Sequence, residues 1–358
     1  MKLAREAKRL CILAEGSFEP VTAKTGTGVI RYGPQTVVAV IDSGRAGQDV
    51  GAVVGAGHGI PIVRDVTEAL RLEPDALLIG IAPRGGQLPA EWRWQLRAAI
   101  EHGVAIINGL HVLLRDDPEL VALARQRDVE LWDVRLPSPD EQVALGTQHR
   151  AGSHTILFVG SDCSIGKMTA ALELDLAARE RGWSSKFVAT GQTGIIIAGD
   201  GVPLDRVIGD FMPGAIERQV VPACQAHDWV WVEGQGSLIH PAYSPVTLAL
   251  VHGARADAMV LVHKPDRTEV RGYGLPIPPL PALIRLYEEA ASWVQPSKVC
   301  AIALNTFGHD DAAARRFIEE AEQLTGLPTD DPVRFKPGKL LDAVATHVAA
   351  VQESKAVA

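Results

Sequence analysis

The sequence predicts an α/β protein built from two successive domains. Its 358 residues are about twice the usual length of a single domain. Aromatic residues make up only 5% of the chain, so Val, Ile, Leu and Ala must fill most of the core, as in parallel strands covered by helices. Short β-branched runs also alternate with helical or turn segments along the chain, which is typical of βαβ units.

The first half of the chain shows this alternation from its start to about residue 136. Six runs predict strands of a mostly parallel sheet, at residues 11–14, 36–41, 60–63, 76–81, 104–107 and 129–134. Helices are expected at 89–102, with a stop at Gly103, and from Asp117 through Arg127. The glycine-rich stretch 54–59 does not open a helix after the first strand, so it predicts a turn and not a dinucleotide site. Arg45 and Arg84 are either solvated loop arginines or anion ligands.

The pattern breaks at Leu136-Pro137-Ser138-Pro139, which predicts a connector and places the domain division at 1–140 and 141–358. A second alternation follows, with strands expected at 155–159, 186–189, 229–232, 258–263 and 299–304. Helices are expected after Gly166, Gly214, Pro281 and Asp310. The proline-rich stretch 274–281 must be extended or looped, since each proline restricts its own backbone and that of its predecessor.

Charge and cysteine usage exclude several classes of protein. The formal net charge is −8, so no electrostatic reason to bind nucleic acid or an anionic membrane exists. The four cysteines lack CxxC spacing, which argues against a disulfide scaffold and a structural zinc site, and we expect no metal site. The apolar stretch near the N-terminus is too short for a signal sequence or a membrane span. We expect a cytoplasmic homo-oligomer that acts on small molecules.

The most specific signal is a glycine-rich loop between an apolar strand and an Ala/Leu-rich helix. Such a P-loop wraps an anionic phosphate in backbone N–H groups, adds the positive end of a helix dipole and supplies a lysine. We therefore expect ten consecutive residues to bind the phosphates of a cofactor: Gly160, Ser161, Asp162, Cys163, Ser164, Ile165, Gly166, Lys167, Met168 and Thr169. Cys163 has no paired base and is interpreted as a loop residue, not a nucleophile.

The loop departs from the common G-x-x-x-x-G-K-[ST] pattern in two ways. It has one extra residue between the glycines and an early Asp162, which resembles the loop of dethiobiotin synthetase-like P-loop enzymes. Met168 also stands where an ATPase needs Ser or Thr to hold Mg²⁺. A loop that binds a pyrophosphate without cleaving it does not need that ligand, so a coenzyme site is favoured.

Two residues after the third strand of this domain are candidates for catalysis. Glu233 ends the apolar strand Trp229–Val232 and should emerge at the carboxyl edge, where open α/β sheets bind ligands. Its Glu-Gly segment resembles the one after the Walker B strand of dethiobiotin synthetase-like proteins; the alternative is a turn carboxylate. His240 is a candidate general base because imidazole titrates near neutral pH, although a histidine beside proline is more often structural.

Other polar residues at the same edge are candidates for substrate binding. A cationic cluster follows the fourth strand, and Arg binds carboxylates in bidentate fashion, although exposed loop charges are common. A second segment, Thr190–Gly194, follows the second strand. The candidates are Gln192, Thr193, Lys264, Arg267 and Arg271.

Together, the loop GSDCSIGKMT and the segments ATGQTG, WVEGQGSLIHPAYSP and VHKPDR resemble a two-domain family that includes D-glutamate N-acetyltransferases. The resemblance implies a Rossmann-like first domain, a P-loop second domain and transfer of acetyl from acetyl-CoA to the amine of D-glutamate or a related acidic amino acid, within amino-acid catabolism. One alternative is an ATP- and Mg²⁺-dependent ligase or carboxylase similar to dethiobiotin synthetase, with Asp162 and Glu233 holding the metal. Another is a nucleotide-sensing module without chemistry of its own.

Overall fold

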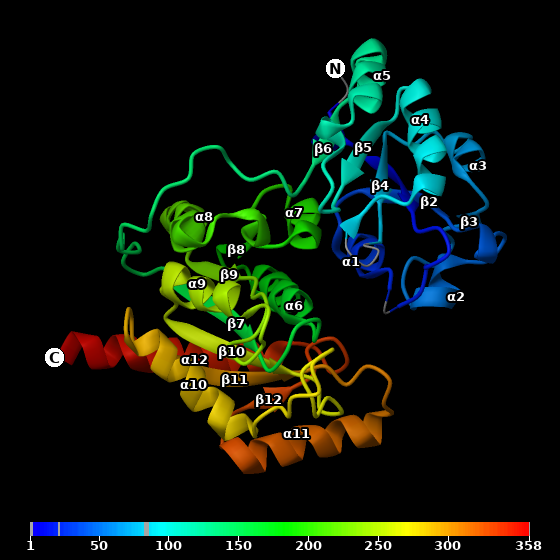
Figure 1. Cartoon of the computed structure of the whole chain (residues 1–358). Helices are drawn as coiled ribbons and strands as arrows, with labels where there is room; N and C mark the ends of the chain where they lie inside the picture. Colours follow the sequence, from blue (N-terminus) through cyan, green and yellow to red (C-terminus); the bar gives the residue numbers. More distant parts are fainter. Residues whose placement is uncertain (1–2, 21, 82–85, 358) are drawn as a thin grey trace. The chain divides into compact units, whose positions relative to one another are not determined.

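The computed structural model describes residues 3–20, 22–81 and 86–357, and divides the chain into two compact units (Figure 1). The first unit comprises residues 1–137 and 192–206, and the second comprises 138–191 and 207–358. The boundary between the units, after Pro137, lies within the predicted connector 136–139. The segment 192–206 is grouped with the first unit, although its sequence lies between two parts of the second.

The first unit contains a six-stranded parallel sheet with the order β3-β2-β1-β4-β5-β6, which is the Rossmann-like order. Each strand coincides with one of the predicted apolar runs, so all six predictions are confirmed. The strands are β1 Arg9–Leu13, β2 Thr36–Ile41, β3 Ile62–Val63, β4 Ala76–Ile79, β5 Ala105–Asn108 and β6 Leu131–Asp133.

The helices of the first unit pack on this sheet and on one another. Asp117 caps α5 by accepting the N–H groups of Glu119 and Leu120, as its position before Pro118 predicts. Residues 24–28 begin α1, and Gly26 lets that helix approach β1: a Cβ there would lie 3.2 Å from Ile12 Cγ2. The helices are α1 Lys24–Tyr32, α2 Val50–Val54, α3 Val66–Leu70, α4 Arg93–Glu101, α5 Pro118–Arg127 and α7 Gln192–Ala198.

The glycine-rich stretch 54–59 forms a turn, as predicted. Gly55 ends α2 in the left-handed conformation, and Gly57 and Gly59 also have positive φ. Arg45 forms an ion pair with Glu19 at the surface. Arg84 lies outside the described residues.

The second unit contains another six-stranded parallel sheet, in the order β12-β11-β10-β7-β9-β8. Five strands match the predicted runs, and the two-residue β12 was not predicted. The strands are β7 His154–Gly160, β8 Ser185–Val188, β9 Trp229–Val232, β10 Ala258–His263, β11 Lys298–Leu304 and β12 Thr329–Asp330.

Helices cover the second sheet in two layers. The pair α6 and α12 packs against the strands, and α8, α9 and α10 form a separate layer with α11 beside α10 (Figure 1). Four of these helices follow the predicted starts, although α8 begins two residues before Gly214; α9 and α12 were not predicted. The bounds are α6 Lys167–Glu180, α8 Met212–Ala226, α9 Ser244–Ala254, α10 Leu280–Ser292, α11 Asp311–Thr325 and α12 Gly338–Val357. None of the helices described here combines the length and the apolar character that a membrane span needs.

The topology places a ligand site at the carboxyl end of β7. From β7 the chain runs to β8 and β9 on one side and then to β10, β11 and β12 on the other. Open α/β sheets bind ligands at such a switch point, outside the carboxyl ends of the strands. The loops after β7, β8, β9, β10 and β11 all begin at this edge.

Candidate active site at the P-loop

The loop between β7 and α6 has the backbone of an anion cradle. Ser164 and Gly166 have φ of 55° and 110°, which turns the chain sharply into the first residue of α6, Lys167. The N–H groups of Ser164, Ile165 and Gly166 donate to no other group among the residues that the structure describes. Amides without an acceptor at the N-terminus of a 14-residue helix favour an anionic oxygen ligand such as a phosphate.

Lys167 is fixed inside this loop. Its ammonium donates to the carbonyl oxygens of Asp162 and Gly236, both at 2.7 Å, and only 5% of the residue is exposed. The segment that supplies Gly236 approaches so closely that its glycines cannot be replaced: a Cβ on Gly234 would lie 1.6 Å from the Phe158 carbonyl oxygen. The spacing Glu-Gly-Gln-Gly therefore brings the carboxyl end of β9 onto the P-loop.

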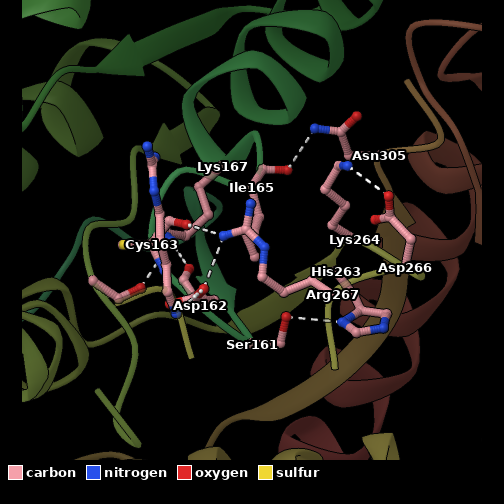
Figure 2. Close-up of polar contacts among 12 residues, drawn as sticks. Ser161, Asp162, Cys163, Ile165, Lys167, His263, Lys264, Asp266, Arg267 and Asn305 are labelled. Atoms are coloured by element: carbon pink, nitrogen blue, oxygen red, sulfur yellow. Dashed lines mark hydrogen bonds and ion pairs between the residues drawn. The ribbon is translucent and has the colours of Figure 1, made fainter. Parts of the chain in front are cut away.

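Asp162 is fully buried and forms part of the loop architecture (Figure 2). Its Oδ2 accepts Arg267 Nη1 at 2.9 Å and the Arg271 N–H at 3.0 Å, and its Oδ1 accepts the Cys163 N–H at 2.7 Å. Burial alone would raise the pKa of Asp162, but the bonds from Arg267 and the two amides outweigh it and hold the pKa below its usual value. Asp162 is therefore an anion already neutralised by the protein.

Glu233 is the ionisable group of this site that is best suited to proton transfer. It lies at the end of β9, 6% exposed, and its Oε2 accepts the N–H groups of Thr190 at 2.9 Å and Gly191 at 3.1 Å. Burial raises the pKa of Glu233 to about 7, against the opposing effects of these amides and of Lys167. No residue described donates to its Oε1. A carboxyl group held by one oxygen, with a pKa near neutrality, meets the requirements of a general base.

His240 lies in a tight turn after β9, beside the P-loop. Its Nδ1 accepts the N–H groups of Ala242 at 3.1 Å and Tyr243 at 3.2 Å. A ring nitrogen that accepts two N–H groups has no lone pair to offer a substrate proton. This contact argues against the predicted role of His240 as a general base and leaves Glu233 as the candidate.

Two family models match the chain. One is described as the DUF1611_N Rossmann-like domain of unknown function and matches residues 43–137. The other is described as the DUF1611_C P-loop domain of unknown function and matches residues 142–341, which include every residue of the site above. The chain belongs to the DUF1611 family. Its expected Rossmann-like and P-loop domains are thereby confirmed.

Relatives of this DUF1611 protein span three quarters or more of its length. A curated protein of Tritonibacter scottomollicae named D-glutamate N-acetyltransferase is 41% identical over 332 residues, which cover 91% of this chain and 95% of that protein. One of Pseudoalteromonas sp with the same name is 38% identical over 75% of this chain and 81% of its own length. The crystal structure of a DUF1611 family protein from Anabaena variabilis has a TM-score of 0.90 and 42% identity, with coverage of 95% and 99%. The resemblance to this family seen in the sequence motifs is confirmed.

Within this family fold, the predicted substrate residues lie in different surroundings. Arg267 is committed to Asp162, and Lys264 forms an ion pair with Asp266 at 2.9 Å (Figure 2). The Arg271 side chain is exposed and has no acidic partner among the described residues, although its amide binds Asp162. Of the cluster, Arg271 has the guanidinium that is best placed to receive a carboxylate.

The other two predicted substrate residues belong to the first unit. Gln192 and Thr193 begin α7, and Thr193 Oγ1 lies 3.0 Å from Thr25 Oγ1 in α1. The cut between the units falls between Gly191, which binds Glu233, and Gln192. Both residues are therefore grouped with the first unit, and their role in substrate binding stays a prediction.

Several residues that support the loop were not predicted. Asn305, at the carboxyl end of β11, donates to the Ile165 carbonyl oxygen at 3.0 Å (Figure 2). Tyr287 of α10 binds both backbone groups of Gly160. Ser161 Oγ contacts His263 Nδ1 at 2.8 Å, and burial lowers the pKa of His263 to about 4, so this imidazole is neutral. Only the position of Asn305 directly after a strand could have pointed to the site.

The proline-rich loop also contributes a side chain. The Val270 N–H donates to the Leu275 carbonyl and the Ile277 N–H to the Thr268 carbonyl, which makes residues 268–277 a hairpin-like loop. Tyr273 at its turn packs edge-on against His240, with ring centroids 5.1 Å apart. Residues 274–279 are looped as expected, whereas Leu280 and Pro281 already begin α10. Tyr273, directly before this stretch, thus brings an aromatic ring to the site.

Proposed function

We propose that this protein transfers an acetyl group from acetyl-CoA to the amino group of D-glutamate or a related acidic amino acid. The observation that carries the proposal is Glu233, a buried carboxyl with a pKa of about 7, beside a P-loop without a Ser or Thr after its lysine. The names of two curated relatives support the substrate and the transferred group. Amine acylation needs a base near neutral pH and no metal ligand after Lys167.

The P-loop would hold the phosphates of the coenzyme. The amides of Ser164, Ile165 and Gly166, which have no acceptor among the described residues, and the ammonium of Lys167 would donate hydrogen bonds to the phosphate oxygens. In this role the P-loop binds the phosphates and does not cleave them. The Arg271 guanidinium would receive a carboxylate of the amino acid, with Lys264 of the same cationic cluster as the candidate for the other.

Glu233 would act on the amino group. Its carboxylate takes one proton from the substrate ammonium, which frees the nitrogen lone pair to attack the thioester carbonyl carbon. The C–N bond forms as the carbonyl π pair moves onto oxygen, where backbone N–H groups stabilise it. The oxyanion then collapses, the C–S bond breaks, and the thiolate leaves with a proton from the acylated nitrogen. The products are the N-acetyl amino acid, the free thiol and one proton released to solvent from Glu233.

A magnesium-dependent ligase is the second enzyme class that the P-loop suggests. Its metal would need Asp162, but that carboxylate already binds Arg267 and two amides. The buried pair makes Asp162 a poor magnesium ligand unless Arg267 moves away. The contacts of the site therefore favour acyl transfer.

The proposal is tested by incubating the purified protein with acetyl-CoA and D-glutamate, with thiol release and the N-acetyl product both measured. We expect stoichiometric release of thiol and product that persists in EDTA, and no product with Glu233→Gln. L-Glutamate and D-norvaline, which lacks the side-chain carboxylate, serve as matched substrates. Product that appears only with Mg-ATP would contradict the proposal and favour the ligase. Tight nucleotide binding without any turnover would favour the sensing module.

A further inference from the structure

His240 is buried in a tight turn and packed between two aromatic rings. It closes the turn Ser237–His240, with its N–H donating to the Ser237 carbonyl at 3.0 Å, and it is 1% exposed. The Tyr243 ring stacks on it at 4.4 Å and the Tyr273 ring meets it edge-on at 5.1 Å. The plane of the imidazole is therefore fixed from two sides.

The hydrogen bonds to the ring also fix its tautomer. Because Nδ1 accepts the N–H groups of Ala242 and Tyr243, the single proton of the neutral imidazole must be on Nε2. Burial lowers the pKa of His240; Asp162 opposes this effect and Lys167 adds to it, so the neutral form prevails at pH 7. The ring thus presents a hydrogen-bond donor and no lone pair.

This donor lies at the P-loop. A ring nitrogen of His240 is within 4.8 Å of an Asp162 carboxylate oxygen and of the Cys163 sulfur. No residue that the structure describes accepts a hydrogen bond from Nε2. The Nε2–H is therefore available to donate to a ligand oxygen bound at the P-loop.

We propose that His240 is a fixed hydrogen-bond donor whose Nε2–H stabilises the acetyl carbonyl oxygen as it becomes an oxyanion. The inference rests on the proposed acetyl transfer and adds a residue to it. The Nε2–H bond stays intact throughout: the C–N bond forms, the carbonyl π pair moves to oxygen and accepts this hydrogen bond, and the pair returns as the C–S bond breaks. Glu233 takes the proton of the substrate ammonium, so His240 exchanges none.

A metal site is the other use of these groups that geometry suggests, since Asp162, Cys163 and His240 converge. None of these three side chains offers the free lone pair or anionic atom that a metal ion needs. Nδ1 of His240 is occupied by two N–H groups, Asp162 is paired with Arg267, and burial and the Asp162 charge raise the pKa of the Cys163 thiol. The cluster is therefore interpreted as a donor site.

Two substitutions separate a donor from a base. The amide nitrogen of Gln occupies the place of Nε2, so His240→Gln keeps a donor but has no basic nitrogen. The amide oxygen of Asn occupies the place of Nδ1, so His240→Asn keeps an acceptor for the Ala242 and Tyr243 amides but loses the donor. We expect His240→Asn to lower kcat about 10²–10³-fold with KM for acetyl-CoA unchanged, as when an oxyanion donor is removed. His240→Gln should keep at least about a tenth of wild-type kcat.

The control is His102→Asn, which should leave kcat unchanged, because His102 is an exposed residue of the first unit whose ring contacts the Ala98 carbonyl. Equal, complete losses for both His240 variants, with melting temperatures like that of wild type, would overturn the donor role. A rise in KM for acetyl-CoA without a fall in kcat would also overturn it, because the donor would then bind a coenzyme phosphate.

A second measurement does not depend on turnover. Nitrogen-15 NMR of the wild-type protein at pH 7.5, with the His240 signal assigned by its loss in His240→Asn, reports which ring nitrogen is protonated. We expect a neutral ring protonated at Nε2. An imidazolium, or a proton on Nδ1, would overturn the inference even if acetyl transfer is observed. If no acetyl transfer occurs, the proposed function fails, while a ring protonated at Nε2 still supports His240 as a donor to a P-loop ligand.

Discussion

Replacement of Glu233 by Gln should abolish acetyl transfer and at the same time stabilise the fold at alkaline pH. In the folded protein, burial raises the pKa of Glu233 from its usual 4.5 to about 7. The native state therefore holds this proton more tightly than the unfolded chain does. The stability that the protonated carboxyl contributes is complete below pH 4.5 and is lost as the pH rises through 7.

The size of the effect follows from the same shift. Each tenfold change in proton affinity is worth about 1.4 kcal/mol, so ionising Glu233 inside the fold costs about 3 kcal/mol above pH 7. Gln carries no charge, and its amide oxygen can still accept the N–H groups of Thr190 and Gly191. The variant should gain up to about 3 kcal/mol over wild type at pH 8 relative to its difference at pH 4.5.

The assay is urea unfolding of both proteins between pH 4.5 and 8, followed by tryptophan fluorescence. Only the pH dependence of the difference between the proteins is interpreted, because the other ionisable groups contribute equally to both. A difference that stays flat over this range would show that the pKa of Glu233 is not raised. The assignment of Glu233 as the base near neutral pH would then fail.

Glu217→Gln is a matched control with the opposite sign. Glu217 is also 6% exposed, but it accepts the N–H groups of Leu145, Gly146 and Thr147. Burial opposes these bonds, yet together with the Thr147 hydroxyl they hold the pKa of Glu217 below its usual value. Its stabilising effect is therefore present above the usual pKa of a glutamate and lost as the pH falls. Glu217→Gln should destabilise the protein at pH 8.

Three further substitutions test the loop. Lys167→Ala should weaken acetyl-CoA binding about tenfold or more in calorimetry, and lower stability by about 1–2 kcal/mol because two carbonyls lose their donor; unchanged affinity would remove the P-loop from ligand binding. Arg267→Ala strands the buried Asp162 carboxylate and should lower the free energy of unfolding by about 1–3 kcal/mol, and by clearly less in an Asp162→Asn background. An equal loss of unfolding free energy in both backgrounds would show that Arg267 does not stabilise the protein through Asp162. Gly234→Ala should cost about 3 kcal/mol or more, whereas Gly209→Ala, whose Cβ meets open space, should cost little; similar melting temperatures would contradict the close approach.

The order of the strands and the positions of some of the helices could be predicted because local sequence patterns determine them. Apolar runs of strand length, proline at helix starts and glycine at turns act over a few residues, and they located eleven of the twelve strands. Such patterns fail where a helix is apolar on most of its faces, as in α9, whose buried residues include Val246, Leu250 and Val251. The two-residue β12 is too short to carry a pattern.

The P-loop and Glu233 could also be found from the sequence, for a related reason. A glycine-rich turn with a lysine between a strand and a helix is specific for phosphate binding. An acid directly after a parallel strand must emerge at the edge of the sheet where ligands bind. The protonation state of that acid could not be predicted, since the pKa of about 7 comes from burial, which the amides of Thr190 and Gly191 offset only in part.

Only the tertiary structure decided what the charged and titratable groups do. The sequence suggests Arg267 as a substrate ligand, but Arg267 pairs with Asp162, which lies 105 positions away along the chain. The sequence also suggests His240 as a base, but the amides of its own turn donate to Nδ1. Gln192 and Thr193 follow a strand of the second sheet, but they pack in the first unit. The physical reason is common to all three: the role of a polar side chain depends on which partner meets it and how much water remains, and folding alone sets both.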